Sequence, residues 1–395
     1  MAKIDDLIEK LCPNGVEYKP IWSLTAWDKK FNGVDKEKQK KIISYKYYLS
    51  TDFAKVERKD GNIKYISTGI SGDDRYTTEE LAGDYLTDGE VVCIPWGGTP
   101  NVKYHKGKFV TGDNRIATSL DVNILSNKFL YYWMQSKINV ISKFYRGSGI
   151  KHPSMKDVLD MNIVVPPLEV QCEIVHILDD FTLLSAELSA ELKARKKQYE
   201  YYKNSLLNIN GEKKKLGEIA NFKTGSKPKK IFEEKNNNYF EYINAGTTNS
   251  GYVEQANFRK NAVTTPSRGQ GGIGFVGYQT KDFWLGPLCY AIYANDDSVL
   301  NNKYLYYELS SKADEILKRK NTGGVPSLNG CDLKTIPINI PPINEQIKIV
   351  KILDKFEKLC NDISEGLPAE IEARQKQYEY YRDKLLTFKE LKVNE

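Results

Sequence analysis

The residues that build metal and redox sites are scarce in this sequence. Its 395 residues include only three histidines, and its six cysteines are scattered with no Cys-x-x-Cys pair. A structural zinc site needs Cys or His ligands at short spacings, and a disulfide framework needs many cysteines in a short chain. We therefore expect no metal site and no disulfides, as in a protein of a reducing compartment.

Long apolar runs and catalytic motifs are also missing. No apolar stretch approaches the ~20 residues that span a membrane, and Met1–Leu11 is typical of a short amphipathic helix rather than a signal peptide. The sequence has no phosphate-binding G-x-x-x-x-G-K-[ST] motif, and its histidines show no spacing typical of a catalytic triad. We expect a cytoplasmic protein, and these residues give no argument for a catalytic site.

Two short motifs imitate cofactor or methyltransferase motifs without their context. Gly269–Gly274 fits G-x-G-x-x-G, but the strand-like Phe275–Tyr278 follows where a dinucleotide site needs a helix. Asn339–Pro342 resembles the N-P-P-[FY] motif of DNA methyltransferases, but an inserted isoleucine breaks it and the Pro-Pro step recurs at Val165–Pro167. We interpret the first as a loop and reject the second.

What the sequence does contain is an internal repeat. Ala194–Leu207 reads ARKKQYEYYKNSLL, and Ala373–Leu386 reads ARQKQYEYYRDKLL. Upstream, Asn302 lies 175 residues after Asn127, and Pro341 lies 175 residues after Pro166. The offset becomes 179 at Ala373, so the second copy carries four extra residues, which fall near Gly366–Pro368. Repeats this far apart indicate a tandem duplication of the whole chain.

Each helical segment carries an apolar stripe. In the first copy the stripe includes Ile174, Leu178 and Phe181 at steps of three and four, which predicts a bundle face or a coiled-coil seam. From Leu168 to Leu207 such a helix would span roughly 60 Å. In the second copy Gly366 and Pro368 interrupt the stripe, which indicates a kink or one helix ending and another beginning.

We therefore predict an α+β fold with a tandem repeat. Two similar mixed domains, here called heads, are joined by two long antiparallel helices that form a coiled-coil rod with an approximate two-fold axis. The predicted segments are 1–165 for an N-terminal helix and the first head, 166–210 for the first spacer helix, 211–340 for the second head and 341–395 for the second spacer helix. A chain of 395 residues suits two domains.

Basic, glycine-rich loops follow a helix in both heads. They are Arg146–Ser154 and Arg319–Ser327. Glycine lets backbone N–H groups approach a phosphate closely, and Lys or Arg neutralises its charge. The net charge of +6 is mild and would not by itself indicate nucleic acid, but the recurrence of the loop favours a phosphate-bearing ligand.

The repeated helices resemble a known family. Pro-Pro-x-x-x-Gln, Ile-Val and Leu-Asp-x-Phe are followed in both copies by Glu-x-x-Ala-Arg-x-x-Gln-Tyr-Glu-x-Tyr. Together with Leu11–Tyr18, Glu365–Ile371 and Lys384–Phe388, this pattern resembles the specificity subunit of type I restriction–modification enzymes. The resemblance covers nearly the whole chain and is strongest in the helices.

The resemblance implies a function and partners. Each head would be a target-recognition domain that reads one half of a split, asymmetric DNA sequence, and the helices would set the unread gap. Two modification subunits would bind S-adenosylmethionine and methylate adenine N6. Two restriction subunits would use ATP and Mg²⁺ for translocation and cleavage. The chain itself would bind no cofactor and do no chemistry.

The resemblance also suggests where DNA and partner subunits bind. Arg suits bidentate contact with guanine, Asn and Gln suit adenine, and Lys suits phosphate. The DNA-contacting residues we predict are Trp96, Asn101, Lys103, Asn114, Arg115, Arg146 and Lys151 in head one, and Lys227, Lys229, Arg268, Gln270, Arg319 and Asn321 in head two. The surface predicted to dock the modification subunits comprises Lys196, Lys197, Arg374, Lys376 and Arg382.

Two other functions remain possible at this stage. The chain could be a coiled-coil adaptor that binds protein only, or the specificity part of a type II-like enzyme with its own methyltransferase. The missing N-P-P-[FY] motif argues against a methyltransferase within the chain. Salt-dependent DNA binding would separate a DNA-reading subunit from an adaptor.

Overall fold

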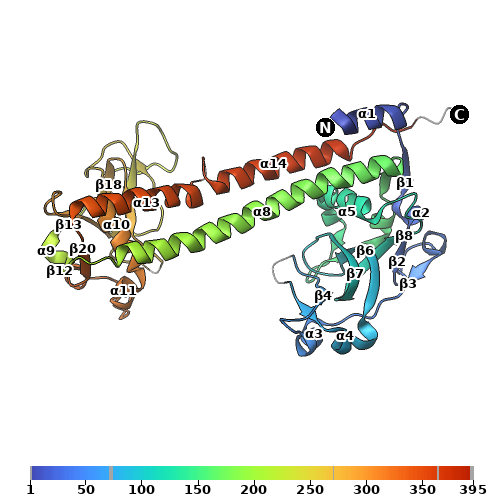
Figure 1. Ribbon diagram of the computed structural model, residues 1–395, viewed down its shortest axis with the longest axis horizontal. Helices are drawn as coiled ribbons and strands as arrows, with labels where there is room; N and C mark the ends of the chain where they lie inside the picture. The colour runs from blue at the N-terminus through green and yellow to red at the C-terminus, as the bar shows by residue number, and fades with distance from the viewer. Residues whose placement is uncertain (1, 71–73, 270, 363, 392–395) are drawn as a thin grey trace. The chain divides into compact units, whose positions relative to one another are not determined.

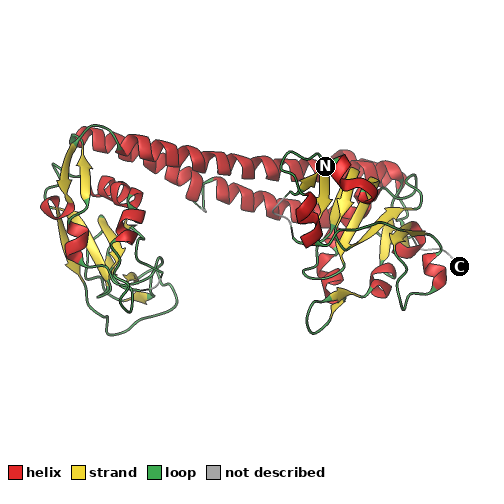
Figure 2. Cartoon of the chain, turned by 90° about the horizontal axis from the view of Figure 1, so that it is seen from below, coloured by secondary structure: helices red, strands yellow, loops and turns green. Residues whose placement is uncertain are grey.

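The computed structural model describes residues 2–70, 74–269, 271–362 and 364–391. The chain forms two compact units: unit 1 holds residues 1–187 with 372–395, and unit 2 holds residues 188–371. Both units combine strands with helices, so the predicted α+β tandem fold is confirmed (Figure 2). The bounds predicted for heads and spacers stay predictions.

Unit 1 is built on a seven-stranded sheet of order β3-β2-β8-β6-β7-β4-β5. Its centre is β6, whose apolar run Val91–Ile94 is fully buried between β7 and β8. The strands are β2 Thr25–Asp28, β3 Ile42–Ile43, β4 Ile63–Ile66, β5 Tyr76–Thr77, β6 Thr87–Pro95, β7 Lys103–Thr111 and β8 Asn114–Ser119. The 112–113 turn lies beside the end of β6, where the 96–102 connection begins, because Asn114 pairs with Pro95 and the Trp96 N–H donates to the Asp113 carbonyl at 3.0 Å.

Short helices and strand pairs surround this sheet. Helix α5 buries Phe129, Leu130 and Trp133 in the core that also receives the start of α8. The remaining elements are α1 Ala2–Leu11, β1 Glu17–Pro20, α2 Ile21–Leu24, η1 Lys36–Gln39, α3 Ser50–Val56, α4 Glu79–Ala82, η2 Gly83–Tyr85, α5 Asn127–Ser136, α6 Ile138–Lys143, β9 Tyr145–Arg146, β10 His152–Pro153, α7 Met155–Leu159, β11 Asn162–Val165 and α8 Leu168–Leu207.

Unit 2 repeats this plan with a divided sheet. Its sheets have the orders β13-β19-β16-β17 and β15-β14-β18, and β12 pairs with β20 as β1 pairs with β11 in unit 1. The elements are β12 Glu212–Lys215, α9 Leu216–Ile219, β13 Ala220–Thr224, β14 Phe240–Ile243, β15 Tyr252–Val253, β16 Ala262–Pro266, β17 Gly277–Gln279, β18 Phe283–Leu285, β19 Cys289–Ala294, α10 Asn302–Ser311, α11 Ala313–Lys318, α12 Gly330–Lys334, β20 Pro337–Ile340 and α13 Ile343–Asn361. Helix α14 Leu367–Leu385 has residues 367–371 in unit 2 and the rest in unit 1, and residues 188–207 of α8 belong to unit 2.

A buried glutamine fixes the start of the long helix in each copy. Gln171 and Gln346 are both fully buried, at 0% exposure. The Gln171 amide donates to the carbonyls of Ile124 and Pro166, and its oxygen accepts from the Ser126 N–H. Gln346 makes the same three bonds one repeat later. Unpaired buried backbone groups are costly, so this residue couples the helix to the turn before α5 or α10.

A tyrosine–aspartate bond reinforces the same joint. The Tyr132 hydroxyl donates to Asp179 at 2.5 Å, and the Tyr307 hydroxyl donates to Asp354 at 2.5 Å. Burial, followed by this bond, raises the pKa of Tyr132, so the hydroxyl stays protonated and acts as the donor. The duplicated frame therefore extends to individual polar contacts, which confirms the tandem repeat.

The aromatic residues of the two helical repeats pack on each other. In unit 1, Phe181 of α8 stacks on Tyr381 of α14 with ring centroids 5.6 Å apart. In unit 2 the roles reverse, and Phe356 of α13 stacks on Tyr202 of α8, also at 5.6 Å. The helices lie side by side and antiparallel within each unit (Figure 1), since Leu385 joins the core formed by the start of α8.

The second repeat is broken where the sequence predicted. Helix α13 ends at Asn361 and α14 begins at Leu367. The Asp362 carboxylate accepts from the backbone and hydroxyl of Ser364, and these bonds lower the pKa of Asp362. A Cβ on Gly366 would lie 2.6 Å from the Lys358 carbonyl oxygen, so glycine is required for the chain to pass here.

Candidate nucleic-acid interface

Two loops that are distant in sequence are joined in unit 1. The Gly98 N–H donates to the Lys151 carbonyl at 3.1 Å. His152 Nδ1 lies 2.7 Å from the Trp96 carbonyl, which can only accept, so Nδ1 is the donor. The Tyr145 hydroxyl donates to the Pro95 carbonyl at 2.8 Å. The 96–101 and 146–154 loops therefore form one surface, named here the head-one loop pair.

The centre of the head-one loop pair is a stack on Trp96. The Arg115 guanidinium lies 3.8 Å from the Trp96 ring, and the His152 ring packs against the indole at 5.0 Å between centroids. Arg115 also pairs with Asp113 at 2.9 Å, and only 7% of its side chain is exposed. Stacking of a buried, paired guanidinium is worth more than an exposed contact. Trp96 is therefore held by contacts with both Arg115 and His152.

Two residues predicted to read bases are internal supports instead. Asn114 is buried and donates to the Ile66 carbonyl at 2.7 Å and to the Thr111 hydroxyl at 3.1 Å. Arg115 is held by Asp113 and Trp96 as described. A base edge needs a free donor or acceptor at the surface, so we remove Asn114 and Arg115 from the base-contacting set.

The other predicted residues of head one divide into anchors and exposed side chains. The Lys103 ammonium donates to the carbonyls of Ser67 and Gly69 at 2.5 Å each, and burial lowers the pKa of Lys103. Asn101 donates to the Thr68 and Thr99 carbonyls. By contrast, Arg146 and Lys151 project into solvent, although Arg146 pairs with Asp157 at 2.9 Å.

Unit 2 joins the equivalent loops by different bonds. The Gly269 N–H donates to the Pro326 carbonyl at 3.0 Å, and the Leu328 N–H donates to the Ser267 carbonyl at 2.9 Å. Arg268 and Asn321, both exposed, each form a backbone bridge with Ser327. The structure therefore brings two predicted residues of head two together on one surface. This surface, formed by residues 266–269 and 321–328, is named here the head-two loop pair.

The other four predicted residues of head two stand apart from this surface or outside the description. Arg319 is already engaged, by Glu315 at 2.7 Å and by the Thr335 hydroxyl at 2.6 Å. Lys227 and Lys229 are exposed on the segment that follows β13. Gln270 lies outside the described residues.

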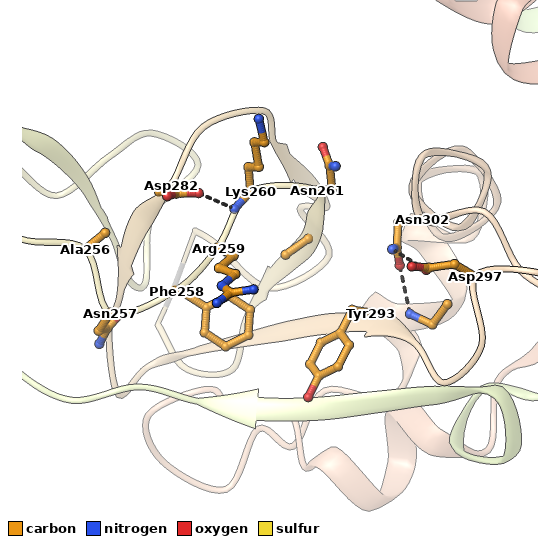
Figure 3. Close-up of a pocket in the computed structure, with 12 residues that line it drawn as sticks. Ala256, Asn257, Phe258, Arg259, Lys260, Asn261, Asp282, Tyr293, Asp297 and Asn302 are labelled. Atoms are coloured by element: carbon orange, nitrogen blue, oxygen red, sulfur yellow. Dashed lines mark hydrogen bonds between the residues drawn. The ribbon is translucent and has the colours of Figure 1, made fainter.

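A separate cavity of unit 2 lies at the other end of β16. It measures about 930 Å³, and Figure 3 shows Phe258, Arg259 and Tyr293 among the residues that line it. Asp282 and Asp297 also line it. β16 runs from Ala262 at this cavity to Pro266 at the loop pair, and five strand residues span about 13 Å. The cavity is therefore not part of the loop-pair surface.

The fold and sequence match proteins of known family. The family model for the type I restriction modification DNA specificity domain matches residues 37–195 and 208–373. The chain belongs to this family. It is 35% identical over 302 residues to the specificity subunit of the type I restriction enzyme EcoR124I/EcoR124II of Escherichia coli, covering 69% of this chain and 74% of that protein.

Two further comparisons agree. A putative type I restriction enzyme specificity subunit of Haemophilus influenzae is 31% identical over 357 residues, covering 84% of this chain and 89% of the relative. The crystal structure of the type I restriction–modification S subunit of M. genitalium has the same fold, with a TM-score of 0.65, 19% identity, and coverage of 94% of this chain and 96% of that one.

These matches confirm the family predicted from the helical motifs. The chain is a DNA sequence-recognition component and is not the catalytic one. Among the described residues, no cluster of His, Cys, Asp or Glu could hold a metal ion. No helix in that part of the chain is long and apolar enough to cross a membrane.

The surface predicted to dock modification subunits is basic, and some of its side chains already bond to neighbouring residues on α14. In this specificity subunit Lys196 and Lys197 are exposed and line a groove of about 540 Å³ on α8. On α14, Lys376 pairs with Glu372 at 2.7 Å, Arg382 pairs with Asp383 at 2.8 Å, and Arg374 donates to Gln377 at 3.1 Å. Of these, the Lys376–Glu372 pair is exposed on both sides, and such a pair contributes little stability, so a partner could replace it at small cost.

Replacing His152 by alanine should loosen the head-one loop pair. The change removes the bond to the Trp96 carbonyl and the ring contact, so we expect local opening to become easier by about 1 kcal/mol. Hydrogen exchange of the 96–101 and 146–154 amides would measure this. Lys151→Ala is the matched control because only its backbone carbonyl joins the loops. Equal protection in both variants would show that His152 does not couple them.

Proposed function

We propose that each loop pair reads one half of a bipartite, asymmetric DNA target. The main support for this proposal is that both units share one scaffold, including the equivalent bonds of Gln171 and Gln346. On this scaffold each unit carries a pair of joined loops, and the two pairs differ in their side chains and in the bonds that join them. A constant frame with divergent loops is suited to reading two different sequences, since recognition residues lie on loops held by a rigid scaffold.

The partners follow from the same proposal. Two modification subunits would bind S-adenosylmethionine and methylate adenine N6, one in each half-site. Two restriction subunits would use ATP and Mg²⁺ to translocate and cleave unmethylated DNA. The helices joining the heads would fix the unread gap, and the complex would act in the cytoplasm, where the chromosome lies. An adaptor that binds only protein is the alternative that the experiments below exclude or support.

The exposed residues of the loop pairs are the proposed DNA contacts. In head one these are Arg146 and Lys151, with Trp96, Asn101 and Lys103 shaping the surface. In head two they are Arg268 and Asn321, with Lys227 and Lys229 as phosphate contacts and Gln270 and Arg319 retained as sequence-based candidates. Arg146 is paired with Asp157, so contact with guanine would require that ion pair to be exchanged.

Exchanging one head tests the assignment of heads to half-sites. Residues 19–163 would be replaced by the same segment of a relative with another target, and methylated adenines would be mapped across the genome. We expect one half of the methylated motif to change while the other half and the gap stay the same. The reciprocal exchange of residues 213–340 is the control and should change the opposite half. A change of both halves by either exchange would contradict the assignment.

Charge reversal on α8 tests the proposed docking surface. Lys196→Glu and Lys197→Glu should each weaken binding of the modification subunit, by about tenfold or ~1.4 kcal/mol, because they oppose an interface of complementary charge. Co-purification and titration calorimetry would measure the effect. Lys235→Glu, an exposed lysine away from the helices, is the control. Unchanged affinity in both α8 variants would place the docking surface elsewhere.

A further inference from the structure

A basic cavity lies beside the head-one loop pair. It measures about 450 Å³ and is enclosed by the 29–33 turn, Trp96, Arg115 and the first residues of α7. Trp96 and Arg115 are therefore shared between the cavity and the loop pair. Lys30 and Lys156, which stand on its rim, were not among the residues predicted to contact DNA.

The charges around this cavity are unbalanced. Four cations line it and none of the lining residues is acidic; the cations are Lys29, Lys30, Arg115 and Lys156. Asp113 accepts from Arg115 at 2.9 Å and from Lys29 at 3.3 Å, which neutralises part of the inner charge. Lys30 and Lys156 are exposed, and neither has an ion pair within the described part of the chain. Two positive charges on the rim therefore remain available to an anion.

The walls of the cavity are held in place by bonds within the protein. Lys29 has a φ of 68° and Gly33 a φ of 79°, so the turn uses two left-handed residues. The Lys29 N–H donates to the Ile43 carbonyl at 3.1 Å, and Gln39 bonds the Phe31 N–H at 3.0 Å. A positive φ is uncommon for lysine, and the bonds on either side of Lys30 stabilise the backbone at Lys29 and Phe31. The backbone position of Lys30 is therefore well defined.

The floor of the cavity favours a phosphate over a base. A base would need a free aromatic face to stack on. Arg115 covers one part of the Trp96 ring at 3.8 Å, and His152 packs against it at 5.0 Å. Phe31, the other aromatic residue of the lining, is only 7% exposed. A phosphate needs only flexible cations and access, and the rim supplies both through Lys30 and Lys156.

We propose that this cavity is a phosphodiester-binding subsite of head one, in which Lys30 and Lys156 clamp the DNA backbone next to the half-site. The inference rests on the proposed function of the heads. Its role is to position the duplex on the head-one loop pair, so it adds affinity and register without reading sequence. A free phosphate or nucleotide shares this chemistry, and the experiment separates the two sources.

The test is the salt dependence of DNA binding by the complex with modification subunits. Each phosphate contact contributes about 0.9 to the slope of log K against log salt. Lys30→Ala and Lys156→Ala should each lower the slope by about that amount. They should also weaken binding equally for the cognate target and for a target altered in the head-one half. Lys59→Ala, which removes one exposed charge just after α3, should keep the wild-type slope.

Three outcomes would overturn the subsite. The first is an unchanged slope in both variants. The second is a loss confined to the cognate target, which would make these lysines base readers. The third is loss of inorganic phosphate or ATP binding, measured by calorimetry, with the DNA slope intact, which would make the ligand a free anion. Wild-type complex that shows no target preference would instead contradict the proposed function. Melting curves should show that the lysine variants are folded, since surface substitutions cost little stability.

Discussion

The reciprocal packing of two aromatic clusters is the constraint on which the rest of the structure depends. Phe181 from the first repeat is covered by Tyr378 and Tyr381 of the second, and Phe356 from the second is covered by Tyr199 and Tyr202 of the first. Aromatic pairs add stability beyond the area they bury. Each repeat supplies a phenylalanine ring that the tyrosines of the other repeat cover. A single repeat without the other would therefore leave its apolar helical stripe exposed. This explains why the YEYY blocks recur and why they serve packing rather than chemistry.

Each head is attached to this helical pairing through the same polar joint. Gln171 and Gln346 satisfy three backbone groups each, and Tyr132 and Tyr307 donate to aspartates on α8 and α13. The Gln171 and Gln346 side chains are fully buried, so removing either amide would leave buried backbone groups unsatisfied. Beyond the joint the heads diverge. Head one stabilises its loop pair with the Trp96 stack, whereas head two uses backbone bonds together with a bond from the Tyr290 hydroxyl to the Leu328 carbonyl. The heads therefore share the polar joint but differ in their sheets and in their loop pairs.

The sequence predicted the frame better than the surface, for a physical reason. Apolar periodicity and the repeat depend on many residues at once, so the helices, the break near Gly366 and the family were all predictable. Whether one polar side chain faces water depends on partners far away in sequence. The Asn114 amide donates to the Ile66 carbonyl, and the Arg319 guanidinium donates to the Glu315 carboxylate and the Thr335 hydroxyl. Lys30 and Lys156 come together only through the fold, and no motif marks them.

Mapping of methylated adenines in cells with and without this chain would show whether the chain directs DNA methylation. The chain would be deleted, then restored from a plasmid, while the modification subunit is present throughout. We predict that one bipartite N6-methyladenine motif disappears on deletion and returns on restoration. A set of methylated motifs that is identical in all three strains would contradict the claim that this chain directs the modification subunits to their DNA target.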